Sequence, residues 1–445
     1  METLKRIFMS LNYFRKIAAT ASCSLFLLSN SFASGLQIWE QSAAGLGDYH
    51  AGGAAEASDA STQWYNPAGL VNLKQPEVSF GGVLVRSDVP FNGTVNVDKI
   101  FNSSGGTYTP EVSAQGGTLT PIPNFHFAYP VNDRFALGFG IVAPFGMVTD
   151  YGASNFLQYV TTKTQIQVVD LTPGFGVKIT PLLSVGAGID IAYVTGEFNQ
   201  NAAVGMINGF WKQASSVNKG HDWTYGFHLG LLFNFTENMR LGLTYHSQMI
   251  ANLHGKSTFE GSLATPSIGT ANYNFKTSFR LPAWTELSFY NRFNKAWAMM
   301  ASAIYTQWDT FKELKLENVV DQSSGNDTIT ILQNYKNTWN FALGVHYNPI
   351  ESLTLKLGTG YDFSPTNNTD RNIYGPDQNR FVLAIGAAYN ITEDLKVDIS
   401  YNHYFVKDAS INTVQTVNAG NTIETVNGTV KSNADLFGLQ LTWKF

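Results

Sequence analysis

The residue types that most often carry chemistry are scattered along this chain and form no recognisable catalytic group. The 445 residues contain no G-x-S-x-G nucleophile elbow and no H-E-x-x-H zinc motif. The eight histidines show no spacing typical of metal ligands. Five of them fall on predicted strands, where a hydrogen-bonded structural role is usual: His126, His228, His246, His346 and His403. We therefore expect no catalytic residues, no metal site, no cofactor and no enzymatic activity.

What the chain does offer is apolar side chains in places where a soluble protein would not expose them. Leu36, Ile38 and Trp39 lie next to the expected mature N-terminus. A polar connection at 199–220 carries a group of large apolar residues: Val204, Met206, Ile207, Phe210 and Trp211. Exposed apolar residues in such a connection mark a binding patch more often than chance. The connection is therefore a candidate capture site, with simple loop packing as the alternative.

A third group interrupts a predicted strand. The run at 135–142, which includes Gly138 and Gly140, leads directly into Ala143-Pro144-Phe145-Gly146. Pro144 cannot donate a ladder hydrogen bond, and glycines weaken a strand or mark a bulge. Two interpretations stay open from spacing alone. Either this fault makes an opening in a barrel wall, or Pro144 simply ends the strand at the outer rim.

The elements that would position these groups are strands with period-two patterning. In the last strand, apolar Phe437, Leu439, Leu441 and Trp443 alternate with small or polar residues. Successive side chains of a strand point to opposite faces, so one face is apolar and the other polar. Elsewhere the polar face includes charged residues such as Lys356, which a filled soluble barrel would not hold. We interpret the apolar face as lipid-facing and the polar face as lumen-facing.

Connections give the number of strands. Short turns are expected at 130–134, 180–182, 236–238, 291–295, 347–352 and 390–394. Long polar connections are expected near 90–116, 148–162, 199–220, 253–270, 313–330, 365–377 and 408–430. Six turns and seven long connections separate fourteen strands, and bacterial barrels have even numbers. Aromatics near the short turns predict an interfacial girdle, with ordinary core aromatics as the alternative: Tyr129, Phe135, Phe233, Phe235, Tyr290, Phe293, Tyr347 and Tyr389.

The N-terminus and the composition place this barrel in an outer membrane. A basic front, an apolar run and Ser31-Phe32-Ala33 form a secretory signal peptide over residues 1–33, with cleavage expected after Ala33. The only cysteine, Cys23, lies inside it. Charged residues are 14 % of the chain, against ~25 % in soluble domains. The acidic net charge of −5 argues against nucleic acid as a partner.

Residues 34–75 do not fit the strand pattern. They are rich in Ala and Gly and contain the triplet Asn66-Pro67-Ala68. Two uses are open from composition: a periplasmic tail, or a hatch that folds into the lumen as a plug. The expected domains are thus the signal peptide at 1–33, the N-terminal hatch at 34–75 and the barrel at 76–445.

At these residues the chain resembles the FadL family of outer-membrane transporters for long-chain fatty acids and hydrocarbons. The resemblance covers essentially the whole mature chain. It includes residues 42–53, Asn66-Pro67-Ala68, Ala143-Pro144-Phe145-Gly146, Gln307-Trp308 and the terminal Trp443-Lys444-Phe445. It implies a fourteen-stranded all-β transmembrane barrel with a hatch, and it places Asn66 and Pro67 in that hatch. In the family, a kink in the third strand makes a lateral opening, which favours the functional interpretation of residues 138–146.

The resemblance implies capture of a hydrophobic ligand at extracellular loops, binding in a hatch-gated pocket and lateral diffusion into the outer leaflet. Expected partners are the hydrophobic ligand and the outer-membrane lipid and lipopolysaccharide around the barrel. A barrel filled by its own hatch can function alone, so we expect a monomer. A general diffusion porin is the main alternative, and an adhesin would need loops but no hatch.

Overall fold

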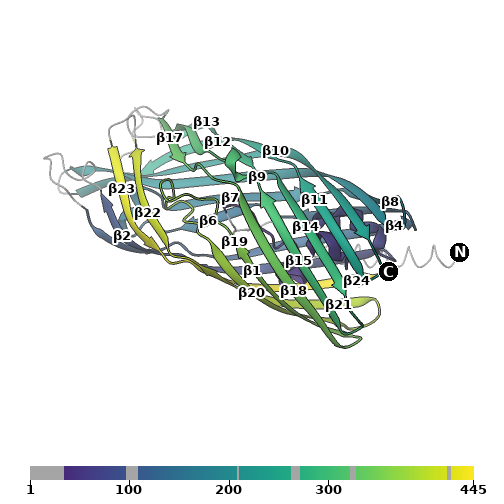
Figure 1. Ribbon diagram of the computed structural model, residues 1–445. Helices are drawn as coiled ribbons and strands as arrows, with labels where there is room; N and C mark the ends of the chain where they lie inside the picture. The colour runs from purple at the N-terminus through teal and green to yellow at the C-terminus, as the bar shows by residue number, and fades with distance from the viewer. Residues whose placement is uncertain (1–34, 97–108, 208–209, 262–270, 321–326, 418–421) are drawn as a thin grey trace.

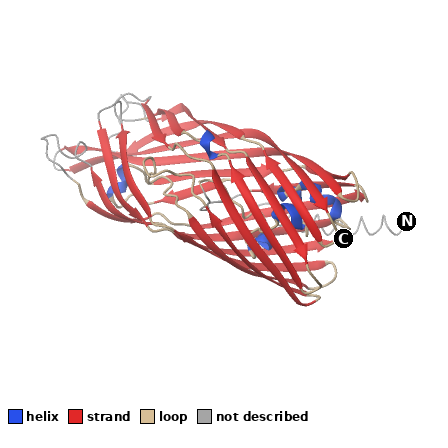
Figure 2. Cartoon of the chain, viewed as in Figure 1, coloured by secondary structure: helices blue, strands red, loops and turns tan. Residues whose placement is uncertain are grey.

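The structure is a computed structural model that describes residues 35–96, 109–207, 210–261, 271–320, 327–417 and 422–445. It is an elongated β-barrel with the C-terminus at one end (Figure 1). Helices are few and short (Figure 2). None of the helices in these ranges is long and apolar enough to cross a membrane. The expected signal peptide lies outside the described residues, so its cleavage after Ala33 stays a prediction.

Fourteen passes of the described chain build the wall, and a bend divides several of them into two strands. In order they are β1 (Glu77–Asp88), β4 (Leu119–Asn132), β5 (Phe135–Val142) with β6 (Gly146–Asp150), β7 (Lys163–Leu171) with β8 (Gly174–Lys178), β9 (Leu183–Ile207), β10 (Phe210–Asn234), β11 (Met239–His246) with β12 (Met249–Gly261), β13 (Ala271–Leu281) with β14 (Trp284–Arg292), β15 (Trp297–Thr306) with β16 (Glu313–Val319), β17 (Asp327–Leu332) with β18 (Thr338–Ile350), β19 (Leu353–Asp362), β20 (Arg380–Asn390), β21 (Leu395–Val406) and β24 (Asn433–Lys444).

The barrel closes on itself. Neighbouring passes pair antiparallel, and β1 pairs with both β24 and β4. Closure pairs the first pass with the last, so neither leaves a free sheet edge, as a membrane requires. The predicted fourteen-stranded transmembrane barrel is confirmed. Short turns join the passes where the sequence predicted them.

In the half of the barrel near the C-terminus, apolar side chains face outward. On β24, Phe437, Leu439 and Leu441 are exposed while Gln440 and Thr442 are buried inside. Phe235, Phe293, Tyr347 and Tyr389 are exposed near the short turns, as a girdle requires. Tyr290 was wrongly assigned to that girdle. It is buried inside the wall, where the Arg240 guanidinium lies 4.4 Å from its ring centre.

The far half reverses this pattern. Large apolar side chains of the long strands point inward and form one buried cluster that includes Phe198, Leu253, Phe275, Leu314 and Ile329. Much of what we expected to be long loops at 199–220, 253–270, 313–330 and 408–430 is strand. The reason is that the alternation continues beyond the membrane with its apolar face turned inward, away from water. The interior at this end is therefore apolar.

A separate four-stranded sheet lies at the end of the barrel away from the C-terminus (Figure 1). It consists of β2 (Pro90–Asn96), β3 (Glu111–Gln115), β22 (Ala409–Val417) and β23 (Thr422–Val430), in the order β22-β23-β2-β3. Val95, Val112, Ile411 and Val426 are buried and belong to the same apolar cluster. The sheet thus extends the apolar interior beyond the wall strands.

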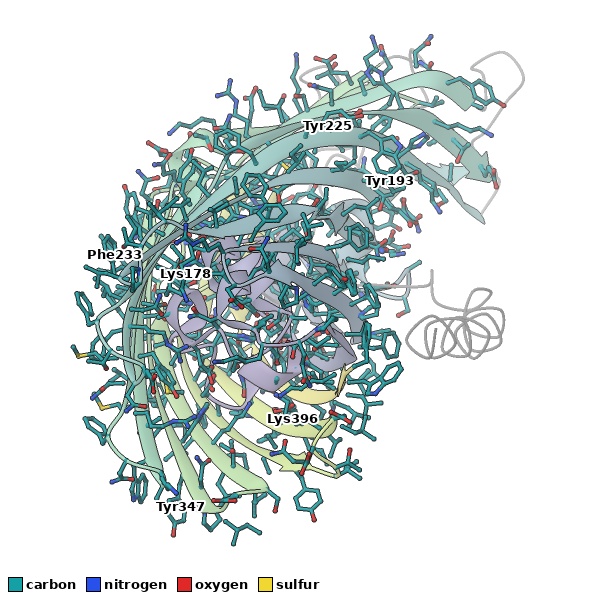
Figure 3. The ribbon with its side chains drawn as sticks, turned by 90° about the vertical axis from the view of Figure 1, so that its right-hand side faces the viewer. Lys178, Tyr193, Tyr225, Phe233, Tyr347 and Lys396 are labelled. Atoms are coloured by element: carbon teal, nitrogen blue, oxygen red, sulfur yellow. The ribbon has the colours of Figure 1, made fainter. Side chains whose placement is uncertain are left out.

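Residues 35–75, hereafter the plug, lie inside the barrel (Figure 3). They form α2 (Ala43–Leu46), α3 (Gly53–Glu56), α4 (Thr62–Tyr65) and the 3₁₀ helix η1 (Pro67–Asn72). Small residues on both sides allow this packing. A side chain at Gly242 of the wall would overlap the Ala54 carbonyl oxygen of the plug. The plug is thus a lumenal element and not a periplasmic tail, although its boundary at residue 34 falls on a residue outside the described chain.

Candidate functional site

The third pass of the wall carries an inward bend between β5 and β6. Val142 of β5 pairs with Asp170 of β7, and Gly146 of β6 pairs with Gln167. Three residues, Ala143, Pro144 and Phe145, therefore stand opposite two residues of β7. One extra residue makes a bulge, and a bulge bends the strand that contains it. We call residues 143–146 the kink.

The kink interrupts the ladder on its other side. β4 and β5 pair only as far as Phe125 and Ile141. Beyond that point, the structure gives residues 119–124 of β4 no partner strand on this side in the described part of the chain. Asn124 in this stretch has both amide atoms buried and unpaired. The wall is thus interrupted beside the kink, and the interpretation that Pro144 merely ends the strand at the outer rim is wrong, because β6 continues beyond it.

The start of the plug takes the place of the missing neighbour strand. Gln37 forms an antiparallel bridge with Phe145. The Ile38 N–H donates to the Pro144 carbonyl at 2.8 Å, and the Gly146 N–H donates to the Leu36 carbonyl at 2.8 Å. Pro144 has no N–H and cannot donate to a ladder, but its carbonyl oxygen can still accept a hydrogen bond. The first residues of the plug therefore close the interruption from inside.

Gln41 completes this contact through its side chain, and sequence analysis missed it. Its amide nitrogen donates to the Ala143 carbonyl at 2.8 Å, and its amide oxygen accepts from the Ala143 N–H at 2.7 Å. The side chain is fully buried. One side-chain amide thus satisfies both backbone groups of Ala143, as a paired strand would. A lone Gln gives no sequence signal for this role.

The predicted apolar residues lie on both sides of this contact. Leu36 and Phe145 belong to the apolar cluster of the far half, and the Phe145 ring lies edge-on to Trp308 at 6.4 Å. Ile38 lies in a second buried cluster on the plug side. Trp39 packs edge-on against Trp284 at 5.2 Å. The kink therefore stands where the plug meets the apolar interior.

Gly138 and Gly140 lie on β5 just before the kink and serve the plug. A side chain at either position would clash with Gln63 of the plug. The Gln63 amide in turn contacts His126 at 3.2 Å and donates to the Thr172 hydroxyl at 3.0 Å. The glycines thus let the plug approach the wall closely, so they contribute by admitting the plug and do not themselves form the bend.

Asn66 and Pro67 anchor the plug on the opposite wall. The Asn66 amide nitrogen donates to the Leu231 carbonyl at 2.9 Å, and its amide oxygen caps η1 by accepting from the Ala68 N–H at 3.0 Å. Pro67 opens η1, a position that suits proline. Both residues are buried, and these hydrogen bonds reach neither the kink nor the apolar cluster. Their place is that of structural anchors.

Ion pairs hold the plug to the wall at the polar end. The Lys396 ammonium lies 3.6 Å from the Asp59 carboxylate, and the His346 imidazole lies 2.6 Å from the Asp48 carboxylate. Burial raises the pKa of Asp59, but Lys396 and hydrogen bonds from Ser61 lower it more, to about 2. Asp59 is therefore ionised at neutral pH and fixes the plug electrostatically.

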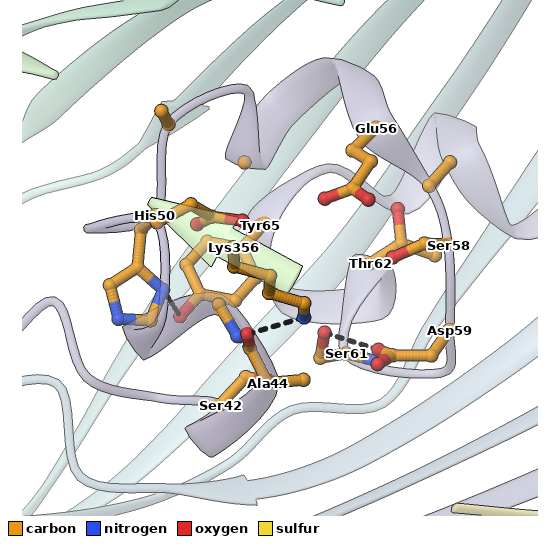
Figure 4. Close-up of a pocket in the computed structure, with 15 residues that line it drawn as sticks. Ser42, Ala44, His50, Glu56, Ser58, Asp59, Ser61, Thr62, Tyr65 and Lys356 are labelled. Atoms are coloured by element: carbon orange, nitrogen blue, oxygen red, sulfur yellow. Dashed lines mark hydrogen bonds between the residues drawn. The ribbon is translucent and has the colours of Figure 1, made fainter. Parts of the chain in front are cut away.

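A small polar cavity lies inside the plug (Figure 4). Its volume is about 30 Å³, and Asp48, Glu56, Asp59 and Lys356 are among the residues that line it. That space holds about two water molecules and no acyl chain. Burial, aided by Lys356, lowers the pKa of His50 to about 3, so its ring is neutral. This cavity is polar packing and not a substrate pocket.

Two cations on the inner side of the wall, Arg380 and Lys356, are buried and paired. Arg380 contacts Asp377 at 2.9 Å and Asp362 at 3.4 Å. Lys356 contacts Asp398 at 3.0 Å and donates to the Ala44 carbonyl at 2.7 Å. A lumen filled by the plug leaves these groups little water, which explains why both take carboxylate partners.

We expected no metal site, and two groups of side chains in the described chain bear on that expectation. Among the described residues, Asp190, His228 and His246 bring three possible ligands together, as do Asp48, Glu56 and His346. In each group one histidine already bonds a carboxylate; the His228 Nδ1 lies 2.7 Å from Asp190. The two histidine rings of the first group are stacked with an angle of 15° between their planes. Their in-plane lone pairs therefore do not converge on a single point.

The predicted capture residues cannot be placed. The backbone of Met206 and Ile207 ends β9, and that of Phe210 and Trp211 begins β10. Their side chains lie outside the described residues, as does the Val204 side chain. The capture role therefore stays a prediction.

Comparison with known proteins identifies the family. The family model for outer membrane protein transport proteins (OMPP1/FadL/TodX) matches residues 24–445. The chain is 28 % identical to outer membrane protein P1 of Haemophilus influenzae, over 96 % of this chain and 98 % of the relative. It is 26 % identical to the long-chain fatty acid transport protein of Escherichia coli K12, over 90 % and 94 %.

Solved structures agree with this assignment. A FadL homologue from Pseudomonas aeruginosa superposes with a TM-score of 0.80 at 25 % identity, covering 92 % of this chain and 99 % of that one. The Pseudomonas putida toluene transporter TodX shares the fold, with a TM-score of 0.68 at 15 % identity over 91 % and 98 %. The chain therefore belongs to the OMPP1/FadL/TodX family of bacterial outer-membrane transport proteins, non-enzymatic channels for hydrophobic molecules.

Proposed function

We propose that this protein carries long-chain fatty acids or similar hydrophobic molecules into the outer membrane through its own wall. The observation that carries the proposal is the interruption between β4 and the kink, closed from inside by residues 36–41. A polar pore would lead straight down the lumen, but here the plug fills it. This arrangement, together with the family, favours a lateral route over a general diffusion porin.

The route begins in the apolar interior of the far half. Inward-facing Phe198, Leu253 and Phe275 belong to one buried cluster with Leu36 and Phe145 at the kink. An apolar molecule entering at this end would move among these apolar side chains toward the start of the plug. The residues predicted from the sequence to capture it first are Met206, Ile207, Phe210 and Trp211.

The gate in this proposal is residues 36–41 of the plug. Their displacement breaks four hydrogen bonds to the kink: Ile38 to Pro144, Gly146 to Leu36, and the two between Gln41 and Ala143. It also breaks four bonds from residues 37–41 to Tyr65, His126, Thr306 and Tyr404. At a net ~1 kcal/mol each, these eight bonds cost about 8 kcal/mol. A chain of ~15 methylenes gains on the order of 10 kcal/mol when it leaves water. A long acyl chain can therefore displace the segment.

The same comparison bears on substrate size. Burial of a single aromatic ring contributes roughly 2–3 kcal/mol, which is less than the cost of breaking the eight bonds. The E. coli relative is named a long-chain fatty acid transport protein, and the P. putida neighbour is named a toluene transporter. Between these two classes, the energetics of the gate favour the long chain for this protein.

Deletion of Pro144 tests the lateral route. It would leave Ala143 opposite Val169 and Phe145 opposite Val168, so that β5 and β6 could pair with β7 without a bulge. We expect the barrel to fold and uptake of labelled oleate to be lost in cells without other such channels. Deletion of Ser154, in the connection after β6, is the matched control. Full oleate uptake by the Pro144 deletion would exclude exit beside the kink.

A further inference from the structure

The outer face of the barrel carries an open pocket, lined mostly by polar and charged residues, that the transport route does not use. Its volume is about 630 Å³. It spans β7, β9, β10, β12 and β13 and is lined by Gln165, Gln167, Tyr193, Thr195, Gly196, Glu197, Lys219, Gly220, His221, Gly255, Lys256 and Tyr273. These side chains face away from the lumen, because Thr195, Glu197 and Lys219 share the face of Tyr193 and Trp223.

The pocket begins where the apolar band of the barrel ends. Along β10 the outward residues Leu229, Phe227, Tyr225 and Trp223 are exposed and apolar or aromatic. The next outward residues are His221 and Lys219. Lys219 precedes Trp223 by four residues, or about 13 Å along a strand. Aromatic residues mark the membrane interface. The pocket therefore lies at the level of the lipid headgroups of the outer leaflet.

The charges of the pocket are mainly positive although the protein as a whole is acidic. Glu197 is the one carboxylate in the lining, and two ammonium groups share it: Lys163 at 3.1 Å and Lys219 at 3.3 Å. Lys256 lies over the Tyr273 ring at 5.0 Å. Lys219 and Lys256 in the lining, with Lys163 beside it, thus outnumber the one lining carboxylate, which leaves a surplus positive charge.

The remaining lining suits sugars. Gln165 and Gln167 offer amide donors and acceptors, and Tyr193 and Tyr273 offer aromatic faces beside the lysines. Lysine binds phosphate as a compact point charge. Charge, hydrogen-bonding groups and aromatic faces together match a phosphorylated saccharide.

We propose that this pocket binds the phosphorylated saccharide headgroup of lipopolysaccharide in the surrounding outer leaflet. The lipid tails would lie against the apolar band below Trp223 while the phosphates meet Lys219 and Lys256. Gln167 also pairs through its backbone with Gly146 of the kink. A glycolipid held here therefore stands one strand away from the interruption in the wall.

The test measures binding of defined lipids to the purified full-length protein in detergent micelles by native mass spectrometry. The wild type is compared with the Lys219→Gln, Lys256→Gln double variant. The control is the Lys336→Gln, Lys431→Gln double variant, which removes the same charge from exposed lysines outside the pocket. The change in gel migration between unheated and heated samples verifies that all three proteins are folded.

We expect the wild type and the control to bind rough lipopolysaccharide equally, and the pocket variant to bind it at least tenfold more weakly. Equal binding by the pocket and control variants would overturn the proposal. Wild-type binding of phosphatidylglycerol as tight as that of lipopolysaccharide would also overturn it, because the saccharide would then contribute nothing. Competition by millimolar inorganic phosphate alone would overturn it in favour of a free-phosphate site.

Discussion

Replacing Gln41 by alanine should loosen the plug from the kink without unfolding the barrel. Gln41 satisfies both backbone groups of Ala143 and also donates to the Ile38 carbonyl at 2.9 Å. Its loss leaves two buried backbone groups unpaired, at about 1–3 kcal/mol each. We take about 2 kcal/mol as the lower bound for the pair, which changes the closed-to-open ratio about 30-fold.

Hydrogen exchange with mass spectrometry measures this directly. The amides of Ile38 and Gly146 bond across the contact, so their protection reports local opening. In Gln41→Ala, protection of peptides spanning 36–41 and 143–147 should fall about 30-fold, while peptides from β14 and β24 should not change. Asn72→Ala is the matched control, because its amide joins plug and wall at Asn234, away from the kink.

Unchanged protection at Ile38 and Gly146 in Gln41→Ala would refute the reasoning, since the kink would then not depend on the plug for its hydrogen bonds. An equal loss in Asn72→Ala would refute it too, because the effect would belong to the plug as a whole.

Two further perturbations address how the plug is seated. Asp59 has a pKa of about 2 in the folded protein, below the ~3.9 of an unfolded chain. Its contribution, on the order of 2 kcal/mol, is therefore complete above pH ~4 and is lost as the pH falls toward 2; exchange protection of the plug should fall over that window in the wild type and not in Asp59→Asn. Gly242→Ala places a methyl group against the Ala54 carbonyl oxygen, so the plug should shift and ion conductance in planar bilayers should rise above the wild-type level; an unchanged conductance would show that the close approach is not needed.

The sequence predicts the wall well because one physical rule repeats along it. The alternation at Phe437, Leu439 and Leu441 follows from lipid on one side and polar groups on the other, and the structure confirms it. The far half breaks the rule because water, not lipid, lies outside there, so Phe198 and Phe275 turn inward. Sequence analysis took these strands for loops for that reason.

The candidate site was only partly predictable. Pro144 and its glycine neighbours announce a fault in a strand, so the location of the kink could be inferred. That Gln41 pairs with Ala143 could not, since the two lie 102 residues apart and no local pattern links them. Tyr290 failed for a similar reason: its place near a turn suggested the girdle, but pairing with Arg240 holds it inside.

Locking the start of the plug to the kink tests the lateral gate most directly. Gln37 and Phe145 form a bridge whose flanking hydrogen bonds make it a non-hydrogen-bonded pair, with Cα atoms about 4.5 Å apart. A disulfide spans that distance, and the only natural cysteine is Cys23. The Gln37→Cys, Phe145→Cys double variant should therefore form a cross-link under oxidising conditions.

We expect oleate uptake to stop when this pair is oxidised and to return on reduction, while each single variant transports in both conditions. Uptake that continues at full rate through the cross-linked protein would contradict displacement of residues 36–41 as the step that opens the wall.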